Sequence, residues 1–354
     1  MLTYRTGPYQ TRETLFSSLG TSTIVFAAAA AAIALTGVFM SMTADRLADR
    51  TGWGEALMGG LFLAGATSLP DFAATLTAAI DSHAELAMSN VMGSMAVNLA
   101  FLGVGDLVYR KANLEHAAAS SANLIQAALL IALLIIPLIA MVTPAYDIWG
   151  IHPVTPLLLA AYILGYTAVR DAHARPMWTP RHTAQTVKDE PEDGGQSGRG
   201  LARLWVDFIL LAAAMAIAGW ALMKAGQTIA AQTALSETAV GGLFTALATS
   251  LPELVTTVAA IRLGALTLAV GGILGTNCFN MTVIAAADIV YPQASIYHAV
   301  TPLQILWGLV TILMTAVLLL GFIYRERYGI AKIGLESFLM LAIYAAAVTF
   351  FLGT

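Results

Sequence analysis

The sequence predicts an all-α integral membrane protein with ten transmembrane helices, arranged as two inverted five-helix repeats. Three observations support this fold class. Hydrophobic residues make up 58% of the 354 residues and charged residues only 11%, which is more apolar surface than a soluble chain of this length can bury. The apolar residues fall into long runs. One stretch of the chain also recurs 182 residues later, at polar as well as apolar positions.

A helix needs about 20 apolar residues to cross a bilayer, and ten runs approach or exceed that length. In chain order they are 20–42, 55–80, 85–109, 121–142, 153–169, 203–224, 237–261, 264–291, 299–323 and 331–352. The fifth run is the shortest of them. The first run is too long for the apolar part of a cleavable signal peptide and lacks a charged start, so we expect it to be retained.

The chain divides at its one long polar stretch, which lies between the fifth and sixth runs. This stretch contains the sequence Lys-Asp-Glu-Pro-Glu-Asp-Gly-Gly at 188–195, a composition typical of a flexible linker. We therefore expect an N-terminal tail (1–19), a first five-helix repeat (20–169), a cytoplasmic linker (170–202) and a second five-helix repeat (203–354).

Positive charge predicts the orientation in the membrane. With the linker in the cytoplasm, fourteen Lys and Arg residues fall in inside segments and three in outside segments, as the positive-inside rule requires. Both termini then face outward. Because five is an odd number of spans, the second repeat enters the membrane in the opposite orientation to the first. Matched residues of the two repeats are expected to meet near the middle of the bilayer.

The repeated stretch places an acid at the same point of each half. Residues 59–98 align without a gap to residues 241–280, and sixteen of the forty positions are identical. Ala-Thr-Ser-Leu-Pro-Asp, ending at Asp71, returns as Ala-Thr-Ser-Leu-Pro-Glu, ending at Glu253. An amide follows each acid 27 residues later, at Asn98 and Asn280. Carboxylates inside apolar helices are costly, so a matched pair indicates a site between the two halves.

The chemistry of this candidate site is oxygen only. Pro70 and Pro252 each remove a helix hydrogen bond, which frees backbone carbonyls, and residues four apart share a helix face. The candidate set is Ala64, Thr67, Ser68, Asp71, Ser94, Asn98, Ala246, Thr249, Ser250, Glu253, Thr276 and Asn280. Such a set suits hard cations, and Ca²⁺ takes about 6–8 oxygens. Two carboxylates balance one Ca²⁺ or two Na⁺, so both ions cannot occupy the site fully at once.

These repeats resemble the α-repeats of the calcium/cation antiporter superfamily, specifically its sodium/calcium exchanger branch. The resemblance covers both repeats and the ten-helix plan, but not the linker or the N-terminal tail. It implies that Asp71 and Glu253 ligate Ca²⁺ together with Thr67 and Thr249. It also implies a set of sodium ligands, which comprises the Thr-Ser pairs (with Ser68 and Ser250), the carbonyls of Ala64 and Ala246, and the hydroxyls of Ser94 and Thr276. Asn98 and Asn280 match the central polar positions of the family.

The coupling ion has an alternative. Calcium/proton exchangers usually present Gly-Asn-rich sequences with Glu and lack paired Thr-Ser before Leu-Pro-acid, which favours sodium. A buried carboxylate can nevertheless carry a proton, so exchange of Ca²⁺ or another divalent cation for H⁺ is the second hypothesis. Asp71 also stands where many sodium/calcium exchangers have Glu, and its reach is shorter by about 1.5 Å.

We therefore expect a prokaryotic plasma-membrane antiporter that expels Ca²⁺ by taking in Na⁺ through alternating access. By the resemblance, the first and sixth helices would slide over the remaining bundle. No enzyme activity and no cofactor are expected, and the partners are inorganic cations and membrane lipid, not nucleic acid. A monomer should suffice. A channel fits a symmetric midplane site of many oxygens less well than alternating access does.

Two further aspartates have two interpretations. Asp106 and the matching Asp288 lie eight residues after the amides, where they would either line the entrances of the ion path or form polar helix ends near the interface. The Gly-x-Gly-Asp sequence ending at Asp106 also occurs in intramembrane aspartyl proteases. The Tyr-Asp pair of those enzymes precedes that motif, whereas Tyr146-Asp147 follows it here, in a predicted external loop.

Overall fold

The computed structural model describes residues 18–51, 64–109, 112–174, 200–326 and 333–353, and these residues form helices without a strand. In the first half the helices are α1 (Leu19–Thr51), α3 (Ala64–Thr67), α4 (Leu69–Ile80), α5 (Ala84–Tyr109), α6 (Leu114–Ala117), α7 (Ser121–Val142) and α8 (Val154–Ala174). In the second half they are α9 (Leu201–Gln232), α10 (Glu237–Ala239), the π-helix η2 (Val240–Thr245), α11 (Ala246–Thr249), α12 (Leu251–Leu263), α13 (Leu266–Val290), the 3₁₀ helix η3 (Ile296–His298), α14 (Pro302–Tyr324) and α15 (Leu335–Leu352).

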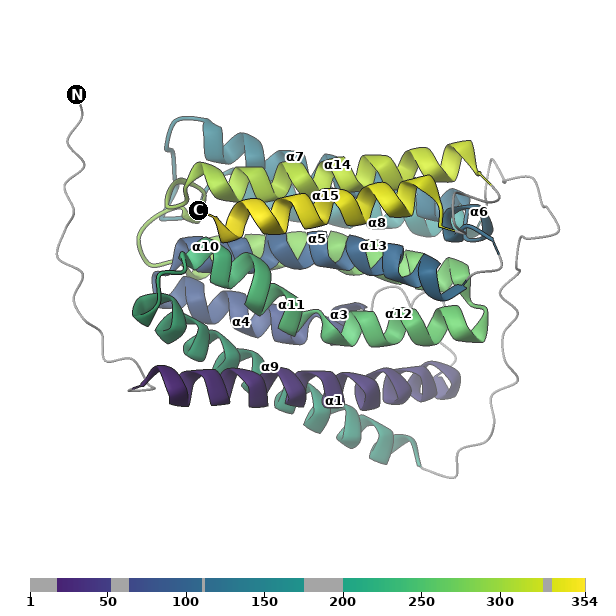
Figure 1. The fold of residues 1–354 in the computed structure, drawn as a ribbon, viewed down its shortest axis with the longest axis horizontal. Coiled ribbons are helices and arrows are strands. Elements are labelled where there is room, and N and C mark those ends of the chain that lie inside the picture. The colour runs from purple at the N-terminus through teal and green to yellow at the C-terminus, as the bar shows by residue number, and fades with distance from the viewer. Residues whose placement is uncertain (1–17, 52–63, 110–111, 175–199, 327–332, 354) are drawn as a thin grey trace.

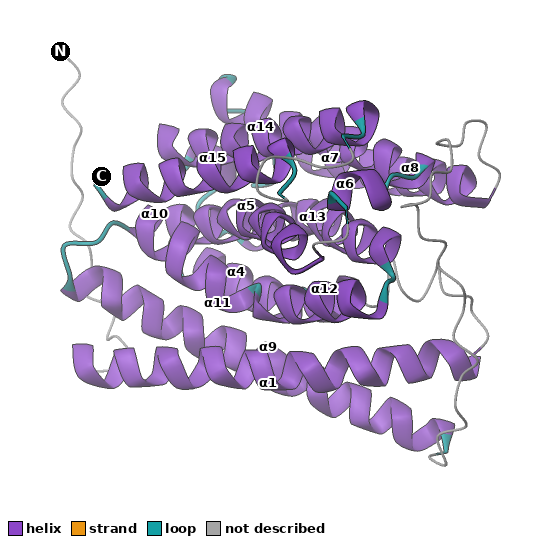
Figure 2. Ribbon diagram, turned by 45° about the vertical axis from the view of Figure 1, so that its right-hand side comes forward, coloured by secondary structure: helices purple, strands orange, loops and turns teal. Residues whose placement is uncertain are grey.

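The long helices lie in layers (Figures 1 and 2). Helices α1 and α9 cross each other on one face of the molecule. Next come α4 and the broken helix that ends in α12, then α5 and α13, and the opposite face is made of α7, α8, α14 and α15. Helix α1 begins and α15 ends at the same end of the bundle.

The all-helical class is confirmed for the described residues, but a count of ten spans is not. Among the described residues, seven helices are long and apolar enough to cross a membrane: α1, α5, α7, α9, α13, α14 and α15. An eighth span is present if the pair Glu237–Thr249 and Leu251–Arg262, bent by 44°, is counted as one. Helix α8 coincides with the fifth predicted run, but it is not among the helices that are long and apolar enough to cross a membrane. It continues to Ala174, into the predicted linker. Part of the second predicted span (55–63), most of the tail (1–17) and most of the linker (175–199) lie outside the described residues.

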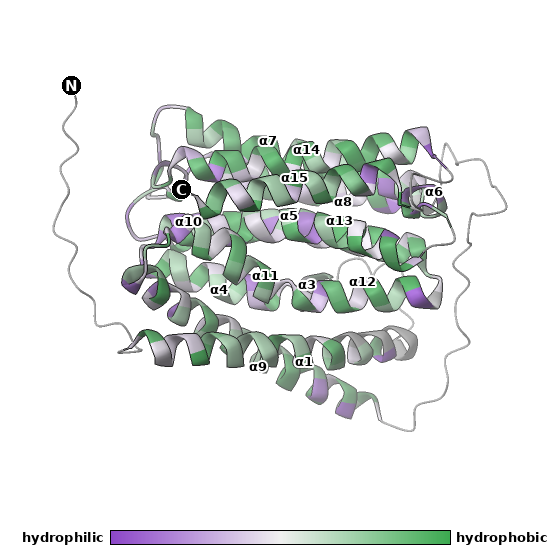
Figure 3. Cartoon of the chain, viewed as in Figure 1, coloured by the Kyte–Doolittle hydropathy of each residue, from purple (hydrophilic) through white to green (hydrophobic). Residues whose placement is uncertain are grey.

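Polar residues lie in the middle layer. In their most apolar windows α5 is 83% buried and α13 is 72% buried, against 22% for α1 and 28% for α9. The outer helices instead expose apolar side chains such as Leu35, Leu210 and Leu320, each 63% exposed. In Figure 3 the green of hydrophobic residues runs along the outer helices. Because lipid accepts such faces and rejects unpaired polar groups, the polar residues of α5 and α13 are placed where only protein surrounds them.

Helices α1 and α9 pack on the bundle through small, separate apolar clusters. One cluster joins Ile33 of α1 to Leu222 of α9 and Ala248 of α11, and it is distinct from the main core. The backbone approaches are close at matched positions. A Cβ atom on Gly37 would lie 2.6 Å from Pro252, and one on Gly219 would lie 2.6 Å from the Pro70 carbonyl oxygen. These two helices therefore rest on the prolines of the repeated motif.

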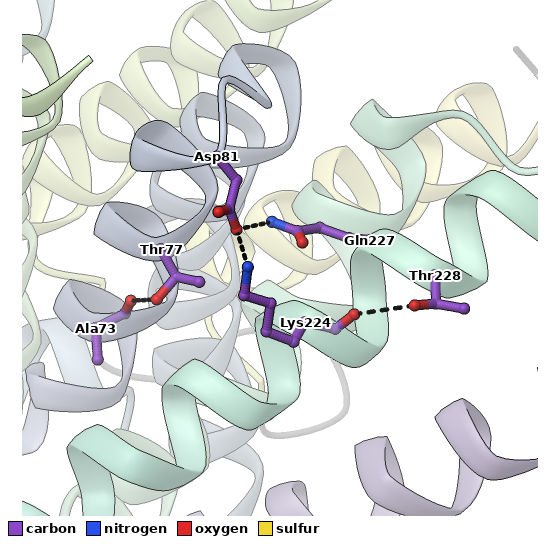
Figure 4. Close-up of polar contacts among 6 residues, drawn as sticks. All are labelled: Ala73, Thr77, Asp81, Lys224, Gln227 and Thr228. Atoms are coloured by element: carbon purple, nitrogen blue, oxygen red, sulfur yellow. Dashed lines mark hydrogen bonds and ion pairs between the residues drawn. The ribbon is translucent and has the colours of Figure 1, made fainter. Parts of the chain in front are cut away.

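A polar contact also ties α9 to the bundle (Figure 4). Lys224 donates to Asp81, the C-terminal cap of α4, and Gln227 Nε2 donates to the same carboxylate oxygen, Asp81 Oδ2, over 2.8 Å. The Lys224 side chain is 22% exposed and that of Asp81 is 20% exposed. The positions 182 residues away are Met42 and Leu263, so the contact is absent from the other half of the repeat.

The second aspartate pair anchors loops. Asp106 Oδ1 accepts from the backbone N–H of Leu114 over 2.7 Å, and Asp106 Oδ2 accepts from that of Gly334 over 2.8 Å. Asp288 Oδ1 accepts from the backbone N–H of Ile296 over 3.0 Å, and Asp288 Oδ2 accepts from that of His152 over 2.9 Å. Both oxygens of each acid are thus used by backbone amides, at positions that all match between the repeats. This arrangement favours the interpretation of Asp106 and Asp288 as polar helix ends. It disfavours a place in the ion path and a catalytic role like that of the aspartyl-protease aspartates.

Candidate ion-binding site

The two Thr-Ser-Leu-Pro runs break their helices at the same residue. Ser68 separates α3 from α4 with φ −80° and ψ 0°, and Ser250 separates α11 from α12 with φ −87° and ψ 4°. Proline is favoured in the first turn of a helix and cannot continue the preceding one, which explains a break two residues before Pro70 and Pro252. The Ser68 N–H still donates to the Ala64 carbonyl, and the Ser250 N–H to the Ala246 carbonyl, so these two backbone hydrogen bonds persist across the breaks.

Threonine hydroxyls cover the carbonyls next to each break. Thr67 Oγ1 donates to the Ala64 carbonyl over 3.2 Å. Thr249 Oγ1 lies 3.2 Å from the Ala246 carbonyl and 2.9 Å from that of Thr245. The Thr and Ala positions of the predicted site are therefore adjacent in both repeats. Each pair presents one hydroxyl and one carbonyl oxygen.

Asp71 joins the two repeats. Its carboxylate is 1% exposed, and Oδ1 accepts a hydrogen bond from Ser94 Oγ of α5 over 2.7 Å. Thr249 of the second repeat also donates to Oδ1, and Asn280 Nδ2 of α13 lies 3.5 Å from Oδ2. Ser94 Oγ lies 3.5 Å from the Ala246 carbonyl. Three predicted site residues, from both halves of the chain, thus contact the Asp71 carboxylate, and the carbonyl of a fourth, Ala246, lies beside Ser94.

Close backbone packing makes this meeting possible. A Cβ atom on Gly93 would lie 2.3 Å from the carbonyl oxygen of Gly242, so α5 rests directly on the π-helical turn η2. Only glycine permits such an approach, and the residue that follows it, Ser94, is carried to the second repeat.

Glu253 is surrounded differently from Asp71. It is 2% exposed and lies near Asp71 and Thr67, yet neither of its carboxylate oxygens has a hydrogen-bond partner. Thr276 on α13, the counterpart of Ser94, is also buried, but no hydrogen bond joins it to Glu253. The symmetry of the sequence is therefore broken in the contacts. The first acid accepts hydrogen bonds from both repeats, and neither oxygen of the second has a partner.

Unpartnered buried oxygens gather among the predicted residues. They are Ser68 Oγ, Ser250 Oγ, Asn98 Oδ1, Asn280 Oδ1, Glu253 Oε1 and Glu253 Oε2. Buried polar atoms in proteins are nearly always paired, because leaving one unpaired costs about 1–3 kcal/mol. Six acceptor oxygens without partners fit a set of ligands for a cation with a preference for oxygen. Within the described residues, no group of three or more His, Cys, Asp and Glu side chains could hold a metal, so hydroxyls, amides and carbonyls must complete any such set.

The structure adds two polar residues that the matched repeats do not reveal. Asn90 donates to Asp71 and to Thr75. Asn277 Oδ1 accepts from Asn98 Nδ2 over 2.9 Å, which connects α13 to α5. The residues that match Asn90 and Asn277 in the other repeat are Gly272 and Met95, so a search for duplicated residues passes over both amides. The available signal is helical spacing, because Asn90 lies one turn before Ser94.

Comparison with known proteins places the chain in a family. The model of the family described as "Sodium/calcium exchanger protein" matches residues 21–170 and 203–353. The chain therefore belongs to the sodium/calcium exchanger protein family. Family and fold are those of membrane transporters for cations, not of enzymes. The two matched ranges lie on either side of the polar stretch that divides the sequence.

The chain is also similar to individual proteins. The inner membrane protein YrbG of Escherichia coli (strain K12) is 28% identical over 219 residues, which span 62% of this chain and 64% of that protein's length. A structure of the sodium-calcium exchanger NCX_Mj superposes with a TM-score of 0.62 at 16% identity, covering 94% of this chain and 99% of the other. A structure of native YfkE gives a TM-score of 0.62 at 16% identity, covering 94% and 93%. At these identities the structural matches show a shared fold.

Proposed function

We propose that this protein exchanges Ca²⁺ for Na⁺ at one site between its two repeats. The observation that carries the proposal is the group of unpartnered buried oxygens around Asp71 and Glu253. An oxygen-only site with two carboxylates matches the ligand preference of Ca²⁺ and, with more hydroxyls and carbonyls, that of Na⁺. The choice of ions is supported by the family assignment and by the fold shared with the sodium-calcium exchanger NCX_Mj.

Competition for the carboxylates would couple the two fluxes. Asp71 lies within hydrogen-bond reach of residues from α5 and α11. Ser94 and Thr249 donate hydrogen bonds to it in this structure, but a hydroxyl can also turn a lone pair toward a cation. The same oxygens can therefore serve either ion. Because two carboxylates neutralise one Ca²⁺ or two Na⁺, one ion must leave before the other is fully bound.

Access to the site would alternate through movement of α1 and α9. These helices share little of the main core and touch the bundle through small apolar clusters. Their glycines rest on Pro70 and Pro252, next to the acids. Low-relief contacts of this kind permit sliding. The proposal further includes ten spans in two inverted repeats, both termini outside, and a monomer as the working unit in a prokaryotic plasma membrane.

Exchange of Ca²⁺ for H⁺ is a second candidate, and one observation favours it. Both oxygens of Glu253 are buried without a donor, an environment that a neutral carboxylic acid tolerates better than a carboxylate. In that case a proton on Glu253 would take the place of Na⁺ during the return step.

Site variants test the proposal. Purified protein in liposomes should show ⁴⁵Ca²⁺ uptake driven by an outward Na⁺ gradient, and Asp71→Asn or Glu253→Gln should abolish it. Asp171→Asn is the matched control, because that aspartate side chain is 74% exposed on α8, and it should retain wild-type uptake. Wild-type rates in Asp71→Asn would exclude a shared-carboxylate site.

A further inference from the structure

Asn90 is the donor to Asp71 that has no duplicate. It is completely buried on α5, and its Nδ2 lies 3.2 Å from Asp71 Oδ1 and 3.0 Å from Thr75 Oγ1. Asp71 and Thr75 are one turn apart on α4, so this single amide group connects α5 to two successive turns of the neighbouring helix.

The chemistry of the amide distinguishes Asn90 from the two hydroxyl donors to Asp71 Oδ1. Ser94 and Thr249 contact Asp71 through hydroxyl oxygens, which can rotate and become ligands of a cation. The amide nitrogen of Asn90 can only donate. Its contact with Oδ1 therefore does not compete with ligation of a cation, and it leaves Oδ2, whose one contact is Asn280 at 3.5 Å.

The second repeat lacks this device. Gly272 stands at the matching position, and no heavy atom lies within 4 Å of the place where its Cβ would be. Glu253 accordingly has no donor at either oxygen. The Asn90–Gly272 pair is thus one source of the difference between the two acids, beside the unequal contacts of Ser94 and Thr276.

We propose that Asn90 is a positioning residue, which fixes the shorter Asp71 side chain with Oδ1 held by α5 and Oδ2 directed to the transported cation. This inference rests on the proposed exchange site. It makes Asp71 the fixed carboxylate of the site and Glu253 the one free to adjust to the ion. Asn90 itself does not touch the ion through its nitrogen.

Asn90→Leu tests the inference, because leucine has a similar size and no donor. A hydrogen bond to a charged group contributes enough for a tenfold or larger effect, so the Ca²⁺ concentration for half-maximal exchange should rise about tenfold. The maximal rate should stay within about twofold. Thr75→Val is the matched control. It removes the other acceptor of Asn90 and leaves the bond to Asp71, and it should change the half-maximal concentration by less than about twofold.

A binding readout separates positioning from packing. In detergent, Ca²⁺ should raise the Tm of the wild type and of Thr75→Val alike, and Asn90→Leu should need about tenfold more Ca²⁺ for the same rise. If Asn90→Leu does not give a folded protein, Asn90→Ala is judged by the same criteria. Wild-type Ca²⁺ dependence in the Asn90 variants, or an equal loss in Thr75→Val, would overturn the inference.

Asp71→Asn, measured in parallel, keeps the two proposals apart. If it loses Ca²⁺ transport while Asn90→Leu behaves as wild type, only the positioning role fails. If Asp71→Asn transports and binds Ca²⁺ normally, the exchange site itself is wrong.

Discussion

The contact between Lys224 and Asp81 gives the sharpest prediction about the movement of α9. Replacing Lys224 by Met removes the ion pair that joins α9 to the end of α4. It leaves a side chain of similar length, and the matching position Met42 shows that methionine is accepted in the other repeat. If α9 must separate from α4 for the site to open at the Lys224 end of the bundle, Lys224→Met favours the state that is open at that end.

The size of the effect follows from the burial of the pair. Exposed ion pairs contribute about 0.2–1 kcal/mol, whereas a hydrogen bond to a charged group contributes about 1.5–3 kcal/mol. Both side chains here are about one-fifth exposed, at 22% and 20%, and Gln227 donates to the same oxygen. A value near 1.5 kcal/mol is therefore reasonable, which corresponds to about a tenfold shift in the equilibrium between the two states.

Transport assays from both sides of the membrane would measure this shift. A change that favours the state open at the Lys224 end should raise apparent Ca²⁺ affinity from that side, predicted to be the outside, by up to about tenfold. Apparent affinity from the opposite side should fall. The charge-exchanged pair Lys224→Asp with Asp81→Lys should restore wild-type behaviour. Arg170→Met, which removes an exposed pair within α8, is the control.

An equal change of affinity from both sides would refute the reasoning, because a shift between two access states must act in opposite directions at the two faces. Unchanged affinities in Lys224→Met would show that the pair does not oppose the movement of α9.

Three further predictions concern stability and packing. Asp106→Asn and Asp288→Asn should each lower the Tm in detergent by several degrees. Each acid accepts two backbone hydrogen bonds, and each bond is worth about 1.5–3 kcal/mol. Unchanged Tm values would show that other contacts hold the loops. The hydrogen bond to Glu237 raises the pKa of His83 above 6.5, against the opposing effect of burial, so its stabilisation should be complete below about pH 6.5 and lost as the pH rises through the raised value. His83→Gln should flatten this part of the Tm–pH curve, and an unaltered curve would contradict the assignment. Gly93→Ala should impair folding or transport, because the added Cβ would lie 2.3 Å from the Gly242 carbonyl oxygen. Gly272→Ala has open space around the added Cβ and should be tolerated. Equal yield and equal uptake for the two variants would be inconsistent with the close packing.

The sequence predicts the helical class and the residues that meet at Asp71, but not their unequal contacts. Hydropathy and an exact 182-residue offset identify Ser94, Thr249 and Asn280 as members of one candidate site, and the structure brings all three to the Asp71 carboxylate. Their role as ion ligands stays a prediction. Asn90 could not be found by duplication, because Gly272 replaces it in the second repeat.

Other differences have equally local causes. Two interpretations of Asp106 were open because the sequence does not show where Gly334 lies, 228 residues away, and its N–H decides between them. Helix α8 follows the fifth predicted run but includes Arg170 and Asp171 near its end, so hydropathy alone does not identify it as a span. A tertiary contact decides the case of Asp106, and composition does not contain that contact.

Ion-driven flux tests the central claim most directly. Liposomes that contain the purified protein are loaded with Na⁺ and diluted into Na⁺-free medium with ⁴⁵Ca²⁺, at equal pH on both sides and with the membrane potential clamped. Sodium/calcium exchange predicts Ca²⁺ accumulation that stops when the Na⁺ gradient is removed and that is absent in Glu253→Gln. No accumulation under the Na⁺ gradient, together with uptake under a pH gradient, would contradict sodium coupling and establish the proton as the counter-ion.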